Sequence, residues 1–191
     1  MTMKYYSTNK TAPKASLEEA VIHGLAPDRG LYMPEVIQKL PAEFFQQLDK
    51  LSLQEIAFTV ANSLFGKDIE ADVLHTIIQE TFSFDIPAVQ VEHNIYSLEL
   101  FHGPTLAFKD VGARFMARLL QYFIQRKGQQ PINVLVATSG DTGSAVANGF
   151  LGVEGIHVYV LYPKGKVSHI QESQFTTLGQ NVTAIEINGV F

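Results

Sequence analysis

The residue in this sequence with the clearest potential for chemistry is Lys109, which stands between Phe108 and Asp110. Residues 95–100 have the pattern of a strand and residues 110–127 that of a helix, so the lysine is expected where a loop enters a helix. A cation is unfavourable in a first helical turn. A partly buried lysine can instead act as a neutral amine and form a Schiff base with a carbonyl compound, and burial against Phe108 would favour that form. The position alone leaves open an ordinary solvated lysine in a loop.

A second candidate site is the run Ser139-Gly140-Asp141-Thr142-Gly143, which separates an apolar strand-like segment from a helix predicted at 145–150. Backbone N–H groups at the start of a helix suit a carboxylate or a phosphate, and ligands of open parallel sheets bind at this edge. The run has neither the spacing of a P-loop nor that of a Gly-x-Gly-x-x-Gly fingerprint. It is therefore a candidate anion-binding loop, with an ordinary glycine turn as the alternative.

Further cations follow the next predicted strand. Lys164 and Lys166 come directly after it, and Ser168 stands at the start of a helix, which together would suit a phosphate group. Arg114, in the helix after Lys109, is a weaker candidate for the same role. Solvated lysines in a turn remain the alternative.

Two kinds of architecture follow one another along the chain. Residues 1–88 are predicted to form a small, mostly helical domain, with capping boxes at Ser16 and Ser52. Residues 89–191 are predicted to form part of a parallel α/β domain with a β-α-β-α-β order. Its apolar strands are expected at 132–138, 156–161 and 181–187. Their composition is typical of a parallel sheet that is covered on both faces, so the predicted fold class is α/β.

The composition excludes several classes of function. The chain has 191 residues, a net charge of −5 and no cysteine, which indicates neither a nucleic-acid-binding patch, a disulfide framework nor a thiolate metal site. The six histidines lack the spacing of a metal site, so no metal is predicted. Neither a signal peptide nor an apolar run of membrane-spanning length is present, and the sequence predicts a soluble cytoplasmic protein without a membrane partner.

The segment around Lys109 resembles the lysine signature of the fold-type II enzymes that depend on pyridoxal 5'-phosphate (PLP). The resemblance is carried by Glu99, Thr105, Ala107-Phe108-Lys109 and Gly112. The longer string from Glu99 to Asp110 is similar to the threonine synthases in particular, and so is the turn-rich loop at residues 24–34, in which Arg29 and Tyr32 can be either structural or ligand-facing. The resemblance spans essentially the whole chain but only about the first half of such an enzyme.

That resemblance implies a carbon–oxygen lyase that converts O-phospho-L-homoserine and water to L-threonine and phosphate, the last step of threonine biosynthesis. Lys109 would hold PLP as a Schiff base and shuttle protons, and Phe108 would lie beside the cofactor. Loop 139–143 would hold the substrate's carboxylate, with Asp141, where related enzymes have Asn, near the cofactor's phenolic oxygen. The substrate's phosphate would be held by Lys164, Lys166, Ser168 and, more weakly, Arg114.

Two alternatives stay open. One is a different lyase or dehydratase reaction on the same fold, although plain dehydratases do not show the loop at residues 28–32. The other is a non-catalytic fragment that binds anions. The resemblance also implies that the cofactor-phosphate loop and the residue facing the pyridine nitrogen come from later sequence. The chain is therefore expected to be the front part of a longer protein that binds PLP poorly by itself, and the sequence predicts no oligomeric state.

Overall fold

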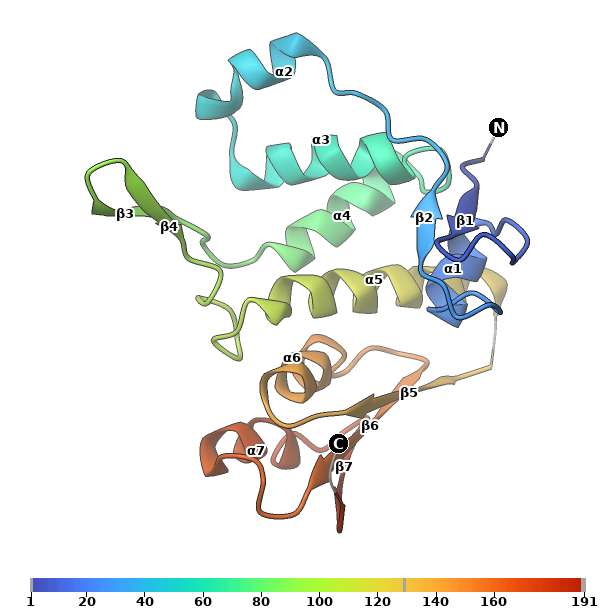
Figure 1. Ribbon diagram of the computed structural model, residues 1–191, viewed down its shortest axis with the longest axis vertical. Helices are drawn as coiled ribbons and strands as arrows, with labels where there is room; N and C mark the ends of the chain where they lie inside the picture. Colours follow the sequence, from blue (N-terminus) through green and yellow to red (C-terminus); the bar gives the residue numbers. More distant parts are fainter. Residues whose placement is uncertain (1, 129, 190–191) are drawn as a thin grey trace. The chain divides into compact units, whose positions relative to one another are not determined.

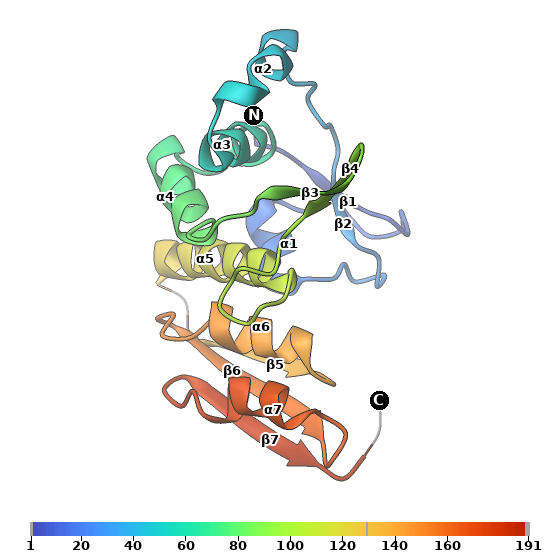
Figure 2. The ribbon, with the colours of Figure 1, turned by 90° about the vertical axis from the view of Figure 1, so that its left-hand side faces the viewer.

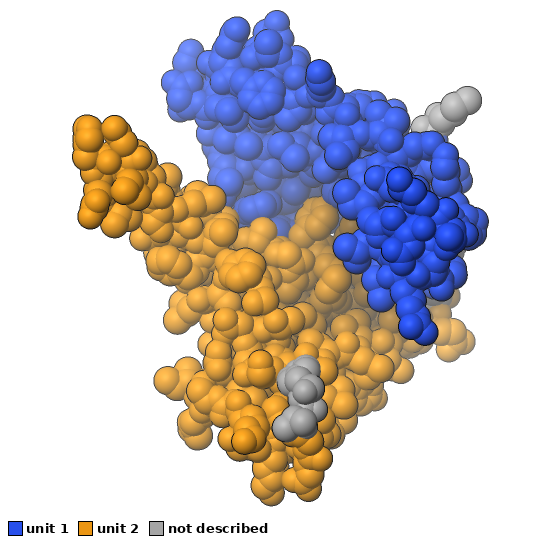
Figure 3. Space-filling model, in the orientation of Figure 1, with its two compact units in different colours: residues 1–82 blue, residues 83–191 orange. Residues whose placement is uncertain are grey.

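The computed structural model describes residues 2–128 and 130–189, and the chain divides into two compact units, residues 1–82 and 83–191 (Figure 3). The domain boundary predicted after residue 88 stays a prediction, and the structure places Ala88 at the first position of a strand. Val190 and Phe191, the last residues of the predicted second domain, lie outside the described residues.

Unit 1 (residues 1–82) is mostly helical, as predicted. Its elements are β1 (Tyr5–Ser7), α1 (Leu17–His23), β2 (Tyr32–Pro34), α2 (Ala42–Gln46), the 3-10 helix η1 (Leu48–Lys50), α3 (Leu53–Phe65) and α4 (Ala71–Thr81). Strands β1 and β2 pair antiparallel. The capping boxes predicted at Ser16 and Ser52 are confirmed, because the hydroxyls of these serines accept the N–H of Glu19 and Glu55, whose carboxylates bond back to the serines.

The turn-rich loop of unit 1 is held by the carboxylate of Asp28. It accepts hydrogen bonds from the Ser7 hydroxyl at 2.5 Å and from the N–H groups of Thr11 and Gly30 at 3.0 Å and of Ala12 at 2.9 Å. These donors, the Ser7 hydroxyl first among them, lower the pKa of Asp28 well below its ordinary value of 3.8. One ionised side chain therefore joins the residues after β1 to the loop before β2.

Unit 2 (residues 83–191) begins with an antiparallel hairpin of β3 (Ala88–Glu92) and β4 (Ile95–Leu98). The second strand ends at Leu98, two positions before the predicted end at residue 100. Nearly every residue of the hairpin is exposed, including Val91 and Tyr96. The long helix α5 (Lys109–Lys127) follows and ends at Gly128, whose left-handed conformation (φ +58°) closes the last turn.

A three-stranded parallel sheet completes unit 2 and confirms the predicted α/β class. Its strands β5 (Ile132–Ala137), β6 (Ile156–Pro163) and β7 (Val182–Ile187) lie in sequence order. Helix α6 (Asp141–Gly149) connects the first two strands and α7 (His169–Thr176) the last two. Helix α6 begins at Asp141, within the glycine run, rather than at residue 145 as predicted. It packs between α5 and the sheet (Figures 1 and 2).

Only one face of this sheet is covered in the part of the chain that the structure describes. Helices α6 and α7 contact each other and the strands, and the side chains beneath them, such as Val158 and Val160, are fully buried. On the opposite face Leu135 is 73% exposed and Ile185 is 40% exposed. The prediction of a sheet covered on both faces is therefore wrong for these residues. The strands carry apolar side chains on both faces, as strands buried on both sides do, but the described elements cover only one of these faces.

Among the described residues, no helix combines the length and the apolar character that crossing a membrane requires.

Candidate active site

The loop that presents Lys109 is closed by a buried carboxylate. Asp110 is 1% exposed and accepts hydrogen bonds from the N–H of Thr105 at 2.9 Å and from its hydroxyl at 2.6 Å. A side chain at Gly103 would come within 2.5 Å of the Asp110 carboxylate, so the loop passes too close to it for any other residue. Lys109 is the first residue of α5, and the bonds of its neighbour Asp110 fix where its backbone lies.

The glycine run is shaped from inside by a hydroxyl group. Thr138, which is 3% exposed, accepts the N–H groups of Gly140 at 3.0 Å and Gly143 at 2.9 Å through its Oγ1. It also donates to the Gly140 carbonyl at 3.0 Å. A Cβ atom at Gly143 would lie 2.2 Å from the Thr138 side chain, so this glycine serves close packing. The buried Gly143 does not border the cleft described next, and its predicted substrate contact stays a prediction.

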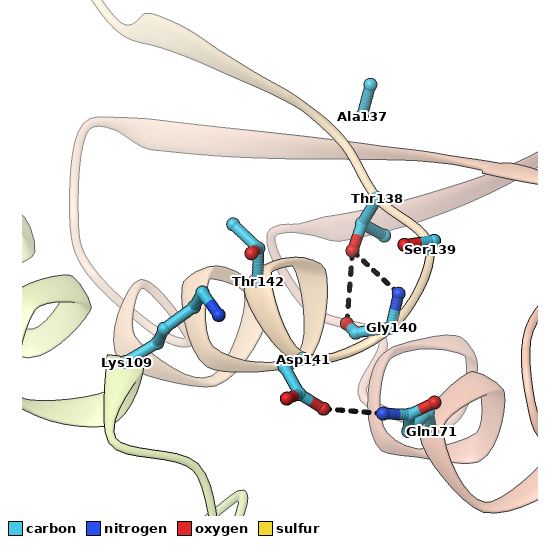
Figure 4. Close-up of a pocket in the computed structure, with 8 residues that line it drawn as sticks. All are labelled: Lys109, Ala137, Thr138, Ser139, Gly140, Asp141, Thr142 and Gln171. Carbon is cyan, nitrogen blue, oxygen red and sulfur yellow. Dashed lines mark hydrogen bonds between the residues drawn. The ribbon is translucent and has the colours of Figure 1, made fainter. Parts of the chain in front are cut away.

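Lys109 and the glycine run face one cleft of about 400 Å³ (Figure 4). It lies within unit 2 at the carboxyl end of β5 and is lined by Lys109, Ala137, Thr138, Ser139, Gly140, Asp141, Thr142 and Gln171. The first N–H groups of a helix have no partner within the helix, which leaves those of Asp141 and Thr142 at the start of α6 to bond to a ligand. Ser139 and Thr142, which also line the cleft, carry hydroxyl groups. Such donors suit a carboxylate or phosphate.

Gln171, in the first turn of α7, is a residue of the cleft that the sequence reasoning did not select. Its side-chain N–H donates to the Asp141 carboxylate at 2.5 Å (Figure 4). Its side-chain oxygen accepts the Ser168 hydroxyl at 2.9 Å. A Cβ atom at Gly140 would meet the Gln171 amide at 2.7–2.8 Å. Only glycine therefore allows the amide to lie against the loop.

The two residues that sequence reasoning missed left weak signals. Thr138 is the last residue of the predicted strand, where a hydroxyl replaces the aliphatic side chains before it. In the sequence, Gln171 stands three positions after Ser168, at the start of a predicted helix. The Ser168 hydroxyl does accept the Gln171 N–H, at 3.4 Å, but the Gln171 side chain turns to the cleft as well.

The residues predicted to bind the substrate's phosphate do not border the cleft. Lys164 and Lys166 are exposed in the turn after β6, and the Lys164 amine lies 3.7 Å from the Glu186 carboxylate. Arg114 donates to the Ser83 hydroxyl at 2.8 Å, and its guanidinium lies 6.0 Å from the centre of the Phe84 ring. Ser168 does not line the cleft but donates a hydrogen bond to the side chain of Gln171, which does. Their roles in phosphate binding stay predictions.

Phe108 covers the lysine amine only in part, since Lys109 is half-buried. Phe108 is 60% exposed, and the Lys109 Nζ lies 4.6 Å from the centre of its ring. A contact of this kind attracts a charged ammonium to the ring face. Phe108 borders the lysine rather than the cleft, and its contact with a cofactor stays a prediction.

Histidine does not build a second site here. His102, in the lysine loop, lies 2.7 Å from the Glu99 carboxylate at a partly exposed position. Within residues 2–128 and 130–189, no three histidine, aspartate or glutamate side chains gather as a metal site.

Unit 1 carries its own shallow cleft of about 340 Å³, lined by Tyr32 together with Lys14, Glu19 and His23 among others. Glu19 is engaged by the Ser16 cap and Lys14 is paired with Glu35. Arg29 does not line this cleft; it is exposed, with a left-handed backbone (φ +65°) beside the Asp28 anchor. The loop itself is held by Asp28, and for Arg29 and Tyr32 both the structural and the ligand-facing role stay predictions.

Comparisons with known proteins identify the relatives of this chain. Residues 4–82 match the family described as "Threonine synthase N terminus". The chain is 43% identical over 189 residues to the threonine synthase of Haemophilus influenzae, covering 99% of this chain and 43% of that protein. It is 41% identical over 207 residues to the threonine synthase of Saccharomyces cerevisiae, covering 98% of this chain and 40% of that protein. The chain therefore spans less than half the length of the curated relatives it matches.

Solved structures show the same similarity. The PLP-bound threonine synthase of Brucella melitensis superposes with a TM-score of 0.92 at 38% identity, over 98% of this chain and 42% of that one. The Escherichia coli threonine synthase gives a TM-score of 0.87 at 38% identity, over 98% and 43%. The resemblance predicted from the segment around Lys109 is confirmed: this chain is similar along nearly its whole length to the amino-terminal part of threonine synthases.

Proposed function

We propose that this chain is the amino-terminal part of a PLP-dependent threonine synthase that converts O-phospho-L-homoserine and water to L-threonine and phosphate. The observation that carries the proposal is one cleft that joins the Lys109 amine to the donors of residues 139–142. An amine suits the aldehyde of the cofactor, and the hydroxyl and N–H donors suit the carboxylate of an amino acid. The similarity to threonine synthases then selects this reaction among those that such a cleft can serve.

The described residues fit the proposed cofactor in part. Lys109 provides the amine that would hold it, and among the described residues that line the cleft it is the only cation. Because the donors of residues 139–142 are assigned to the substrate's carboxylate, no described residue of this lining is left for the cofactor's phosphate, which supports the expectation that the chain alone binds PLP poorly. When bound, PLP supplies an electron sink for chemistry at the α-carbon of an amino acid.

The residues of the chain would divide the remaining tasks. The amides of Asp141 and Thr142, with the hydroxyls of Ser139 and Thr142, would orient the substrate's carboxylate. The Lys109 amine, once free, would move a proton between the α- and β-carbons of the substrate. We further propose that Lys166 neutralises the departing phosphate, a role that rests on the resemblance, and that the protein works in the cytoplasm.

The test is the change Lys109→Ala in the complete protein, with Lys39→Ala as an exposed control in unit 1. We expect the Lys109 variant to lose threonine formation and the visible absorption of bound PLP, because the only amine of the cleft is removed. The control should keep both. Threonine formed by the Lys109→Ala protein at the unchanged rate would exclude the proposal.

The same assay decides between the proposed reaction and another PLP reaction on this fold. Serine and threonine are offered beside O-phospho-L-homoserine. Turnover of serine or threonine alone, still dependent on Lys109, would replace the threonine synthase proposal by a dehydratase.

A further inference from the structure

Two opposite charges border the same cleft without forming an ion pair. Lys109 and Asp141 both line it, yet within the described residues no ion pair joins the Lys109 amine to the Asp141 carboxylate. Figure 4 shows the Lys109 side chain extending toward the first turn of α6, while Asp141 is bonded to Gln171. The carboxylate is engaged on the side of α7, away from the amine.

The Gln171 amide is oriented by a second hydrogen bond. The Ser168 hydroxyl donates to the amide oxygen of Gln171 at 2.9 Å and accepts the backbone N–H of the same residue at 3.4 Å. The amide oxygen is thus occupied, and the amide N–H points to Asp141, whose ionised carboxylate can only accept. The amide can lie against residue 140 because glycine has no side chain there.

We propose that Gln171 is a positioning residue that holds the Asp141 carboxylate away from Lys109 and so keeps the lysine amine available to an aldehyde. This inference rests on the proposed function, because it assigns Lys109 as the amine that reacts. Without the Gln171 amide, the Asp141 carboxylate would turn to the nearest cation of the cleft, which is Lys109. Pairing would stabilise the protonated amine, and a protonated amine has no electron pair with which to attack a carbonyl carbon.

The reaction used as the test is simple. The Lys109 nitrogen forms a bond to the aldehyde carbon, the carbonyl oxygen leaves as water, and borohydride then reduces the carbon–nitrogen double bond to a stable amine. The probe is pyridoxal, which lacks a phosphate group. The labelling rate therefore does not depend on binding of a phosphate at another site. Mass spectrometry of peptides gives the labelling rate at Lys109 and, as an internal reference, at Lys39.

The test uses the whole chain in four forms: unchanged, Gln171→Met, Gln171→Met with Asp141→Asn, and Gln125→Met as a control on the exposed side of α5. We expect Gln171→Met to slow labelling of Lys109 about threefold to fivefold, the range that an exposed ion pair supplies, without a change at Lys39. The added Asp141→Asn should restore the rate, because an amide carries no charge to pair with the lysine. The Gln125→Met control should label like the unchanged chain.

The outcomes separate the inference from the proposed function. Equal labelling of Lys109 in the unchanged chain and in Gln171→Met would overturn the inference alone. A slow rate that Asp141→Asn does not restore would also overturn it, since Gln171 would then act through the shape of the loop. Labelling of Lys109 no faster than Lys39 in the unchanged chain would also overturn the inference, whereas the proposed function is decided by the Lys109→Ala test in the complete protein. Circular dichroism verifies folding, and Gln171→Leu replaces Gln171→Met if that variant unfolds.

Discussion

The side chain of Tyr5 buries a hydroxyl that has no hydrogen-bond partner among the described residues. The residue is 5% exposed, and burial, with a smaller effect of Asp68, raises the pKa of the Tyr5 phenol from 10.0 to about 12. A buried donor without a partner costs stability relative to an apolar group of the same shape.

We therefore expect Tyr5→Phe to raise the free energy of unfolding by about 1 kcal/mol at neutral pH. The raised pKa has a second consequence. Above pH 10 the unfolded chain loses this proton while the folded chain keeps it, so the unchanged protein loses stability as the pH rises from 10.0 toward about 12. Tyr5→Phe lacks this loss. Urea unfolding of both proteins at several alkaline pH values measures it, with the half-buried neighbour Tyr6→Phe as control; a variant less stable than the unchanged chain at neutral pH would contradict the expectation.

For single residues, the sequence predicted those that a short local pattern marks. It did not predict those whose role depends on a contact with a residue far away in the chain. Lys109 and the run 139–143 were predicted because an amine beside a helix start and glycines after a strand can be recognised in the sequence; of that run, residues 139–142 line the cleft. Gln171 could not be predicted in the same way. Its contact with Asp141 joins the starts of α6 and α7, residues that are far apart in the chain.

Among the elements, the loop from Gly103 to Asp110 is the one whose shape the site depends on most. Its carboxylate is buried and receives two hydrogen bonds from Thr105. The Thr105 carbonyl in turn accepts a hydrogen bond from the side chain of Gln174 in α7 at 3.3 Å. The lysine loop and α7 are therefore bonded through one threonine.

We expect Thr105→Val, which removes only the hydroxyl donor, to lower the free energy of unfolding by about 1–3 kcal/mol, because a buried oxygen of Asp110 loses its partner. Thr177→Val is the control, since that hydroxyl donates to an exposed carbonyl at the end of α7. Denaturant unfolding followed by circular dichroism compares the two. Equal stability of both variants would show that the Asp110 carboxylate finds water or another donor.

Element boundaries were predictable where a local signal ends the element and not where a tertiary contact does. The boxes at Ser16 and Ser52 set the starts of α1 and α3 as predicted. Helix α6 starts earlier than predicted because Thr138 satisfies the N–H groups of Gly140 and Gly143, which lets the helix begin inside a run that looks like a turn. Whether both faces of a strand are covered likewise depends on the elements that pack against it. The sequence of β5 alone therefore led to the wrong prediction that both of its faces are covered.

On the scale of the whole molecule, acid is expected to act first on unit 1. Asp28 joins separate segments there through an ionised carboxylate whose pKa is lowered by the Ser7 hydroxyl. The stabilisation from a lowered pKa is complete above the ordinary value of 3.8 and is lost as the pH falls below it, because the folded state must then take up a proton against its hydrogen bonds.

Asp28→Asn should therefore lower the melting temperature at neutral pH and flatten its fall below about pH 4, because an amide cannot accept these hydrogen bonds with a full charge. Calorimetry between pH 7 and pH 2 measures both effects. Asp49→Asn, an exposed change in η1, is the matched control. A variant that shows the same acid dependence as the unchanged chain would remove Asp28 from this role.

The hydroxyl of Thr138 has a consequence for how the site meets a ligand. Its bonds to the N–H groups of Gly140 and Gly143 fix the backbone of residues 139–143, so that no bound anion is needed to order this loop. The run is thus preorganised: a ligand gains its contacts without first paying the entropy of freezing a mobile segment. Empty and occupied forms of the protein should accordingly have superimposable backbones at residues 138–143.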